Sequence, residues 1–211
     1  MLSRKPITRS GRGFRLKYPS AKLGRMVECE SLLEGEVVHL IEFSSAVVSY
    51  REQPARIEYW DGERMREYFP DFELVLTDGS CVHLEVKPSD ALRKPLNVAK
   101  YRAIAAHYSE RGQIFRIVTE QEARREPLRS NLRRLTYLRG RKGVLLPSVR
   151  TLQQLLGTDA CRFEIVQGQL GGEMTWRLLA NELLRCDLRR PIVAETLLSI
   201  DTGGCDATIL L

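Results

Sequence analysis

The sequence predicts a mixed α/β domain of the α+β kind, with a mixed β-sheet flanked by helices, followed by a small, mainly helical module. Two patterns predict the sheet. Apolar residues alternate on both sides of an Asp-Gly turn between residues 68 and 87, which indicates a β-hairpin. Strand, helix and strand patterns then follow one another between residues 82 and 119, which indicates a right-handed crossover to a parallel strand. A chain of 211 residues is long enough to bury such a core.

The hairpin has two possible registers. A two-residue turn would pair apolar with polar side chains and would place Asp71 and Glu85 on opposite faces. A three-residue turn pairs Leu74 with Val82 and Asp71 with Glu85, and it places Gly79 where the backbone needs the left-handed conformation. Because register follows the buried face, we expect the three-residue turn. The two carboxylates would then repel each other unless a cation or a proton lies between them.

A helix is expected before the hairpin, because Ser31 and Glu34 have the spacing of a capping box and an apolar stripe follows them. Glu34 borders that stripe. It could be a solvated capping residue, or it could be a third acidic group directed at the hairpin. Residue chemistry leaves both possibilities open, and it leaves Glu28, Glu30 and Glu36 as competitors for the second role.

The remaining elements complete the expected sheet and its cover. Strands are expected at residues 46–50, 56–60 and 113–119, and helices at 96–108 and from Pro127 onward. Beyond residue 143 short helices are expected from Ser148 to Leu156 and from Glu173 to Leu184, with a strand or wing at 190–193 and a final turn at 195–200. This pattern suggests a module of winged-helix type that docks onto a partner.

Basic residues are concentrated in two segments. Residues 1–25 carry eight Lys or Arg and no acid, and residues 124–142 carry eight against Glu126 alone, whereas the net charge of the whole chain is +6. Residues 1–25 have few large apolar side chains, so we expect a flexible arm or an extended lead-in rather than a packed element. The segments suit a phosphate backbone, although a solubilising tail and a solvated helix face would have the same composition. The candidate DNA-binding residues are Arg4, Lys5, Arg12, Arg15, Lys17, Arg129, Arg133 and Arg134.

Several classes of protein are not expected from the composition. Five cysteines show no CxxC spacing and the three histidines are scattered, so a zinc site is not expected and the thiols are expected to be reduced. No window has the length and apolarity of a membrane span, and the N-terminus lacks the apolar run of a signal peptide. We therefore expect a cytoplasmic protein.

Asp71, Glu85 and Lys87 form a set suited to phosphodiester hydrolysis. Two carboxylates can hold Mg²⁺ through oxygen ligands, and the metal can acidify a water and stabilise charge on the phosphate. A nearby lysine can orient that water or neutralise the transition state. The alternative is a surface hairpin with ordinary cross-strand ion pairs, which would explain Lys87 but not two acids that face each other.

Pro70-Asp71 and Glu85-Val86-Lys87, with the two acids fourteen positions apart, match the PD-(D/E)xK nuclease signature. A wider set of segments, in the same order over roughly residues 26–120, resembles the N-terminal nuclease domain of the TnsA family, which provides the endonuclease subunit of heteromeric cut-and-paste transposases. The segments are Ser31-Leu32-Leu33-Glu34, Val47–Pro54, Tyr68–Phe72, Val82–Pro88 and Lys100-Tyr101.

The resemblance implies a restriction-endonuclease-like fold and a specific site. It implies that Glu34, Asp71, Glu85 and Lys87 are catalytic, and that Glu34, Asp71, Glu85 and the carbonyl of Val86 bind two Mg²⁺ ions, which Mn²⁺ could replace. It thereby selects Glu34 among the acids of the first helix. The implied domains are a basic arm at 1–25, a nuclease domain at 26–142 and a partner-binding module at 143–211.

The resemblance also implies a function and partners. The enzyme would be a bacterial, Mg²⁺-dependent DNA endonuclease that cuts the 5′ ends of a transposon, the non-transferred strands. Its partners would be double-stranded transposon ends, a DDE transposase subunit and, through the C-terminal module, an AAA+ ATPase regulator. The alternatives are another nuclease of this fold (a junction resolvase, a restriction enzyme or a phage end nuclease) and a DNA-binding or assembly subunit that does not cut.

Overall fold

The computed structural model describes residues 16–54, 56–140 and 143–201. Two compact units divide between Arg124 and Arg125, and each is described by itself. The domain boundary at residue 142 stays a prediction. Arg4, Lys5, Arg12 and Arg15, four of the candidate DNA-binding residues, lie outside the described residues.

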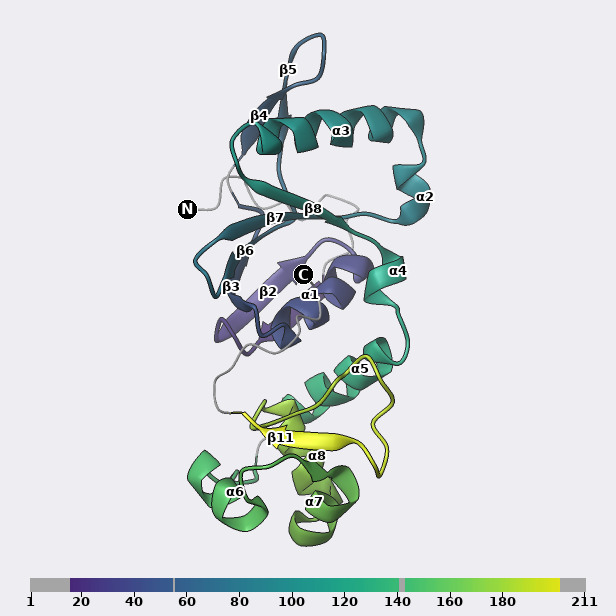
Figure 1. Ribbon diagram of the computed structural model, residues 1–211. Helices are drawn as coiled ribbons and strands as arrows, with labels where there is room; N and C mark the ends of the chain where they lie inside the picture. Colours follow the sequence, from purple (N-terminus) through teal and green to yellow (C-terminus); the bar gives the residue numbers. More distant parts are fainter. Residues whose placement is uncertain (1–15, 55, 141–142, 202–211) are drawn as a thin grey trace. The chain divides into compact units, whose positions relative to one another are not determined.

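A four-stranded mixed sheet forms the centre of the first unit (Figure 1). Its strands lie in the order β3 (Val47–Glu52), β6 (Phe72–Leu76), β7 (Cys81–Val86) and β8 (Ile114–Val118). The first three are antiparallel, whereas β7 and β8 are parallel and are joined through α2 (Ser89–Leu92) and α3 (Pro95–Ser109). The prediction of a mixed sheet with a crossover helix is confirmed.

The β6–β7 hairpin has the register of the three-residue turn. Leu74 pairs with Val82 and Phe72 with Leu84. The turn closes with the N–H of Leu76 donating to the carbonyl of Ser80 at 2.9 Å, and Gly79 has a φ of +83°. The register prediction is therefore confirmed, and it brings Asp71 and Glu85 to adjoining positions at the end of the ladder.

Gly79→Ala is expected to destabilise the first unit by about 1–2 kcal/mol, because an L-residue is strained at a positive φ. No atom lies within 4 Å of the place where a Cβ would stand, so the effect comes from the backbone alone. Chemical denaturation of wild type and variant measures it. Asp78→Ala, in the same turn, separates this backbone effect from the loss of side-chain contacts, because it removes the carboxylate that accepts from the N–H and the hydroxyl of Ser80. Equal stability of Gly79→Ala and wild type would contradict the turn assignment.

Helices cover both faces of this sheet (Figure 1). The helix α1 (Leu32–Phe43) buries Val37, Val38 and Ile41 against the apolar face of the hairpin. The other face lies under α3, whose buried residues are Tyr101, Ile104 and Tyr108. The two strand faces differ because side chains alternate along each strand. The α3 face therefore carries polar side chains of the hairpin under an aromatic cover.

An N-terminal hairpin packs beside α1. It consists of β1 (Leu16–Ser20) and β2 (Arg25–Cys29), which pair antiparallel. Tyr18 and Ser20 are buried in it, so the expectation of an unpacked arm is wrong for these residues. The physical reason is that β1 alternates buried and exposed side chains, a short pattern that is obscured by the basic composition of residues 1–25 as a whole.

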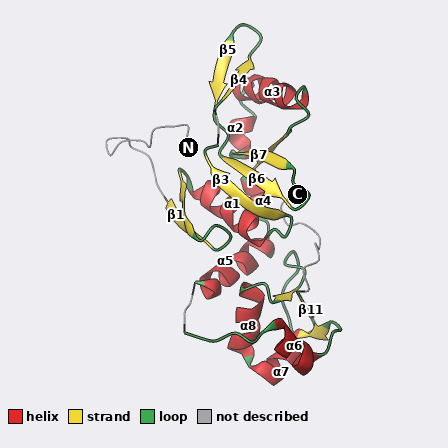
Figure 2. Cartoon of the chain, turned by 90° about the vertical axis from the view of Figure 1, so that its left-hand side faces the viewer, coloured by secondary structure: helices red, strands yellow, loops and turns green. Residues whose placement is uncertain are grey.

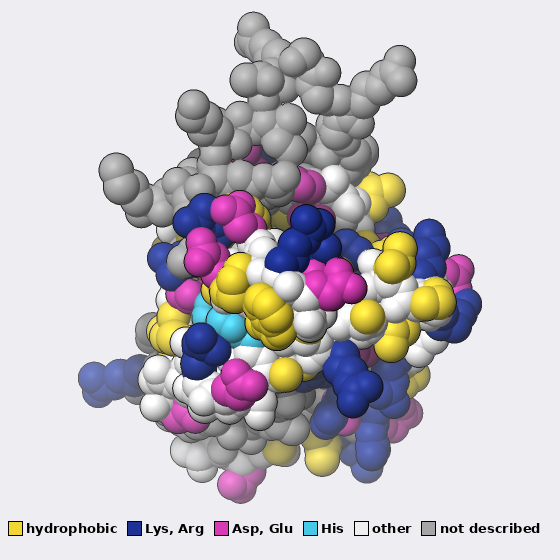
Figure 3. Space-filling model, turned by 90° about the horizontal axis from the view of Figure 1, so that it is seen from above, with side chains coloured by type: hydrophobic (Ala, Val, Ile, Leu, Met, Phe, Trp, Pro, Cys, Tyr) yellow, Lys and Arg dark blue, Asp and Glu magenta, His cyan; other side chains and the backbone are white. Residues whose placement is uncertain are grey.

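A second hairpin extends from the central sheet and packs on α3 (Figure 2). Its strands are β4 (Ile57–Trp60) and β5 (Met65–Tyr68), and Trp60 pairs with Met65. Tyr59 and Tyr68 are buried, whereas Trp60 and Met65 are more than half exposed. Figure 3 looks down on the side of the molecule that carries α3 and this hairpin, where hydrophobic side chains lie among charged ones. The first unit ends with α4 (Glu120–Ala123).

The second unit combines helices with a three-stranded sheet in the order β10, β11, β9. Its elements are α5 (Leu128–Arg139), α6 (Val149–Leu156), β9 (Cys161–Arg162), α7 (Phe163–Leu170), α8 (Gly172–Ala180), β10 (Leu184–Arg185) and β11 (Leu197–Ile200). The Ser148 cap of α6 is confirmed, since its side chain accepts from the N–H of Thr151.

Two expectations for the second unit are wrong. Residues 191–193 are irregular rather than a strand, and the expected final turn contains the strand β11. Pro191 lacks the N–H that a ladder needs, which is consistent with the irregular backbone there. The winged-helix assignment stays a prediction. No helix among the described residues has the length and apolarity needed to cross a membrane.

Candidate acidic site at the end of the central hairpin

Asp71 lies immediately before β6, where the chain leaves Pro70 and enters the sheet. Its carboxylate Oδ2 accepts a hydrogen bond from the backbone N–H of Val86 at 2.7 Å. Its own carbonyl accepts from the N–H of Gln53 at 2.8 Å. Asp71 is thus fixed from two sides, by β7 through its side chain and by the end of β3 through its backbone.

Glu85 lies one residue before the end of β7 and is only 3% exposed. Each of its carboxylate oxygens accepts a hydrogen bond from a tyrosine. The hydroxyl of Tyr101 donates to Oε1 at 2.5 Å, and the hydroxyl of Tyr68 donates to Oε2 at 2.6 Å. A buried carboxylate needs such partners, because an unpaired buried charge is very unfavourable.

Lys87 follows Glu85 by two positions, so both side chains leave the same side of the strand. The Nζ atom of Lys87 lies 3.3 Å from Oε1 of Glu85, and the lysine side chain remains 36% exposed. Its backbone N–H donates to the carbonyl of Val118 at 3.0 Å, which extends the β7–β8 pairing to this residue. The lysine is therefore anchored at its backbone and reaches solvent with its charge.

Glu34 is positioned by the start of α1. The side chain of Ser31 accepts from the N–H of Glu34 at 3.1 Å, and the carboxylate of Glu34 accepts from the Ser31 hydroxyl at 2.9 Å and from the N–H of Glu30 at 2.7 Å. These contacts are those of a capping residue. They are compatible with the other possibility, a third acidic group directed at the hairpin, because Glu34 is also half-buried and interacts electrostatically with Glu85.

The carboxylates of Glu34, Asp71 and Glu85 influence one another. Burial raises the pKa of Asp71 well above its usual value, and the charges of Glu85 and Glu34 raise it further. The hydrogen bond from the N–H of Val86 and the charge of Lys87 act in the opposite direction and lower this pKa. Burial also raises the pKa of Glu34. Hydrogen bonds from the N–H of Glu30 and from Ser31 lower it, whereas the charges of Glu30 and Glu85 raise it. The local field is therefore negative.

Cys29 of β2 experiences the same field. Burial raises the pKa of its thiol to about 12, and the charges of Glu34, Glu52 and Asp71 add to the effect. A thiol of this kind stays protonated at neutral pH. Cys29 is therefore a buried neighbour of the acidic site and is influenced by its charges.

The donor set suits a hard divalent cation such as Mg²⁺, which prefers carboxylate oxygens. Each oxygen of Glu85 accepts one tyrosine hydroxyl and keeps lone-pair capacity, and Oδ1 of Asp71 accepts no hydrogen bond from the described residues. A cation would relieve the mutual repulsion that raises the pKa of Asp71 and Glu34. Within the described ranges, no three His, Cys, Asp or Glu side chains are gathered closely enough to hold a metal ion.

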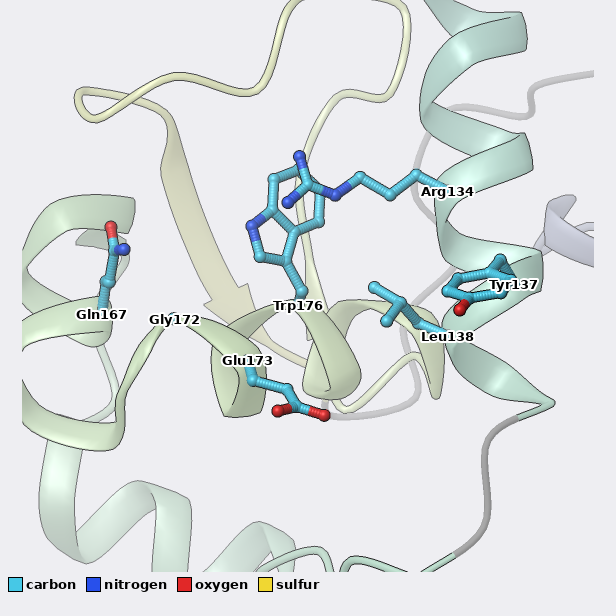
Figure 4. A pocket seen from close by; sticks show the side chains of 7 residues that line it. All are labelled: Arg134, Tyr137, Leu138, Gln167, Gly172, Glu173 and Trp176. Atoms are coloured by element: carbon cyan, nitrogen blue, oxygen red, sulfur yellow. The ribbon is translucent and has the colours of Figure 1, made fainter.

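The other candidate DNA-binding residues lie in different settings. Lys17 of β1 is exposed, 3.6 Å from Glu28. Arg129, Arg133 and Arg134 belong to α5 of the second unit. Figure 4 shows the guanidinium of Arg134 lying across the indole of Trp176, and the distance to the ring centre is 3.5 Å.

That contact borders a cavity of about 420 Å³ within the second unit. Its lining residues are Arg134, Tyr137, Leu138, Gln167, Gly172, Glu173 and Trp176 (Figure 4). The cavity is separate from the acidic site, because all its residues belong to the second unit.

Sequence reasoning did not identify three residues that organise the acidic site: Gln53, Tyr68 and Tyr101. Gln53 has a φ of +43°, a left-handed conformation that is uncommon for a residue with a side chain, and its N–H holds Asp71. Tyr68 and Tyr101 were visible only as parts of the segments that carry the family resemblance. A usable signal was that buried tyrosines need a partner for the hydroxyl.

The fold and the site together define a mixed α/β protein in which Asp71, Glu85 and Lys87 lie at the end of a central hairpin. The comparison with known families is more specific: residues 44–120 match the TnsA-like endonuclease N-terminal domain. The match includes Asp71, Glu85 and Lys87, whereas Glu34 precedes it. No curated protein matches the chain. The matched domain is that of an endonuclease family.

Proposed function

We propose that this protein is a Mg²⁺-dependent DNA endonuclease that cleaves the 5′ ends of a transposon within a heteromeric cut-and-paste transposase. The observation that carries the proposal is the arrangement of Asp71, Glu85 and Lys87 at one end of the β6–β7 hairpin, inside the segment that matches the endonuclease family. Burial and the charges of Glu85 and Glu34 raise the pKa of Asp71, and a cationic occupant would relieve the repulsive part of this effect.

In this proposal Glu34, Asp71, Glu85 and the carbonyl of Val86 would hold the metal. When bound, Mg²⁺ would acidify a water molecule and stabilise negative charge on the phosphate. The protein's own contribution is to position the carboxylates, through the Val86 N–H on Asp71 and the tyrosine hydroxyls on Glu85. Lys87 brings a positive charge beside Glu85, where it can contact a phosphate oxygen.

The domain plan is part of the proposal. The nuclease activity belongs to the residues before 143, with DNA bound by Arg4, Lys5, Arg12, Arg15, Lys17, Arg129, Arg133 and Arg134. Residues 143–211 contact an AAA+ ATPase regulator, and a DDE transposase subunit cuts the other strands. The basic composition of residues 1–25 and of α5 supports a phosphate partner.

The direct test incubates the full chain with duplex DNA that carries the element's ends and with the DDE transposase encoded beside it. We expect a nick at each 5′ end in Mg²⁺ and none in a chelator. Cleavage that is independent of the transposase and of the element's ends would instead favour a restriction-type or resolvase nuclease. Absence of cutting with all partners present would favour a subunit that only binds DNA.

Deleting residues 1–15 is expected to weaken DNA binding and to flatten its salt dependence. The segment carries five Lys or Arg, so the slope of log K against log salt should fall by at most about 4. The deletion stops before β1, which leaves the folded hairpin intact. Fluorescence anisotropy at several salt concentrations measures the slope. A full-length chain with these five residues changed to Gln is the matched control for length. An unchanged slope in both the deletion and the Gln variant would show that these five residues do not bind DNA phosphates.

A further inference from the structure

Two tyrosines from different elements meet at one buried carboxylate. Tyr68 ends β5 and Tyr101 lies in the middle of α3, and their hydroxyls occupy different oxygens of Glu85, at 2.6 and 2.5 Å. Distances of this length are typical of O–H donors to an ionised carboxylate. The lone-pair directions that remain on each oxygen are therefore fixed by the tyrosines.

The rings that carry these hydroxyls are themselves held in place. Tyr68 and Tyr101 are both about 5% exposed or less and belong to a buried aromatic cluster with Tyr59, Ile104 and Tyr108. The ammonium group of Lys100 lies 5.2 Å from the ring centre of Tyr68 and 5.1 Å from that of Tyr101. One cation thus contacts both rings, on the residue next to Tyr101.

Tyr108 belongs to the same cluster and can be compared with Tyr68 and Tyr101. Tyr108 is as buried as its neighbours, but its hydroxyl finds no hydrogen-bond partner among the described residues. Packing of the cluster therefore does not require that a hydroxyl be paired. The hydroxyls of Tyr68 and Tyr101 differ from that of Tyr108 because they reach Glu85.

We infer that Tyr68 and Tyr101 are positioning residues that hold the Glu85 carboxylate between them, one hydroxyl on each oxygen, with Lys100 fixing both rings. The inference rests on the proposed nuclease function and deepens it, because it assigns the groups that orient an acidic metal ligand. Partners behind a metal ligand orient it, and their loss typically lowers metal affinity or activity 10- to 100-fold.

The first test examines the geometry without metal or DNA. Ring Cζ signals of isotope-labelled tyrosine are recorded by NMR on the full chain, before and after Glu85→Gln. We expect the signals of Tyr68 and Tyr101 to shift and that of Tyr108 to stay. Unchanged signals for Tyr68 and Tyr101 would overturn the inference whether or not the protein is a nuclease.

The second test uses Tyr68→Phe and Tyr101→Phe, with Tyr108→Phe as the matched control for loss of a buried hydroxyl. We expect calorimetry with Mg²⁺ alone to show binding weakened about 10- to 100-fold in the first two variants and unchanged in the control. Cleavage assays should show a lowered kcat with little change in KM for DNA, because the tyrosines do not contact the substrate. Thermal melts report folding separately.

The outcomes separate the two proposals. Equal Mg²⁺ binding and kcat in all three variants, in a wild type that binds Mg²⁺ and cuts DNA, would overturn the positioning role alone. A wild type that neither binds Mg²⁺ nor cuts DNA, with the NMR shifts as expected, would refute the nuclease function and reduce the tyrosines to a structural network.

Discussion

Asp71→Asn is expected to lower Mg²⁺-dependent cleavage by about 10³-fold or more. A metal ion stabilises the transition state by several kcal/mol, and each 1.36 kcal/mol corresponds to a tenfold change in rate. The variant removes one charge from the proposed ligand set. It keeps a side-chain oxygen that can accept the hydrogen bond from the N–H of Val86, so the end of the hairpin should remain folded.

The same substitution is expected to stabilise the metal-free protein at neutral pH. The pKa of Asp71 is raised in the fold by burial and by the charges of Glu85 and Glu34, so its ionised form is unfavourable there. Each unit by which the pKa is raised corresponds to about 1.4 kcal/mol. Above the raised pKa this penalty is complete, and as pH falls toward the unfolded-state pKa it disappears.

The stability difference between Asp71→Asn and wild type should therefore be largest near pH 7.5 and should shrink as the pH is lowered. Denaturation at several pH values, with and without Mg²⁺, measures it. Saturating Mg²⁺ should reverse the order, since a ligand at 100 times its Kd stabilises the native state by about 2.7 kcal/mol. Undiminished cleavage, or a variant less stable than wild type without metal, would contradict the assignment of Asp71. Asp78→Asn, in the exposed turn of the same hairpin, controls for charge removal.

The central hairpin was predictable because its register depends on local rules. Alternation defines the buried face, and the position of Gly79 selects the turn, so the pairing of Leu74 with Val82 follows from the sequence. The helix from Ser31 and the crossover through α3 were predictable for the same reason, since capping and periodicity are local.

The support of the site could not be predicted in this way, because it depends on contacts between distant segments. Tyr101 reaches Glu85 from another element, and nothing near Tyr101 in the sequence indicates a carboxylate partner. The hairpin of β1 and β2 was missed because its basic residues have the composition of a disordered arm, and its packing depends on α1. Amino-acid composition indicates how well a segment is solvated on average, whereas the packing of this hairpin depends on the contacts of single buried residues.

One such residue is Glu42 of α1. Glu42→Ala is expected to destabilise the first unit by about 3–5 kcal/mol, because it leaves buried hydrogen-bond donors without an acceptor. Glu42 is 1% exposed. Its Oε1 accepts from the hydroxyls of Ser20 at 2.5 Å and Tyr50 at 2.7 Å, and its Oε2 accepts from the N–H groups of Ala21 at 3.1 Å and Lys22 at 3.3 Å. The substitution leaves four donors without this acceptor. The two hydroxyls are buried, and an unsatisfied buried donor costs about 1–3 kcal/mol, so these two account for an effect of this size.

The effect should be local as well as large, because the four donors belong to the β1–β2 hairpin and to β3. Hydrogen exchange should show lost protection at the amides of Ala21 and Lys22 together with a lower free energy of unfolding. Glu36→Ala is the matched control on the same helix, since Glu36 contacts the exposed Arg124 and a surface pair of this kind contributes at most about 1 kcal/mol. Equal destabilisation by the two variants would show that Glu42 does not hold the hairpin. A selective loss at Glu42 would show that the N-terminal hairpin, which contributes Cys29, is part of the folded unit that carries the acidic site.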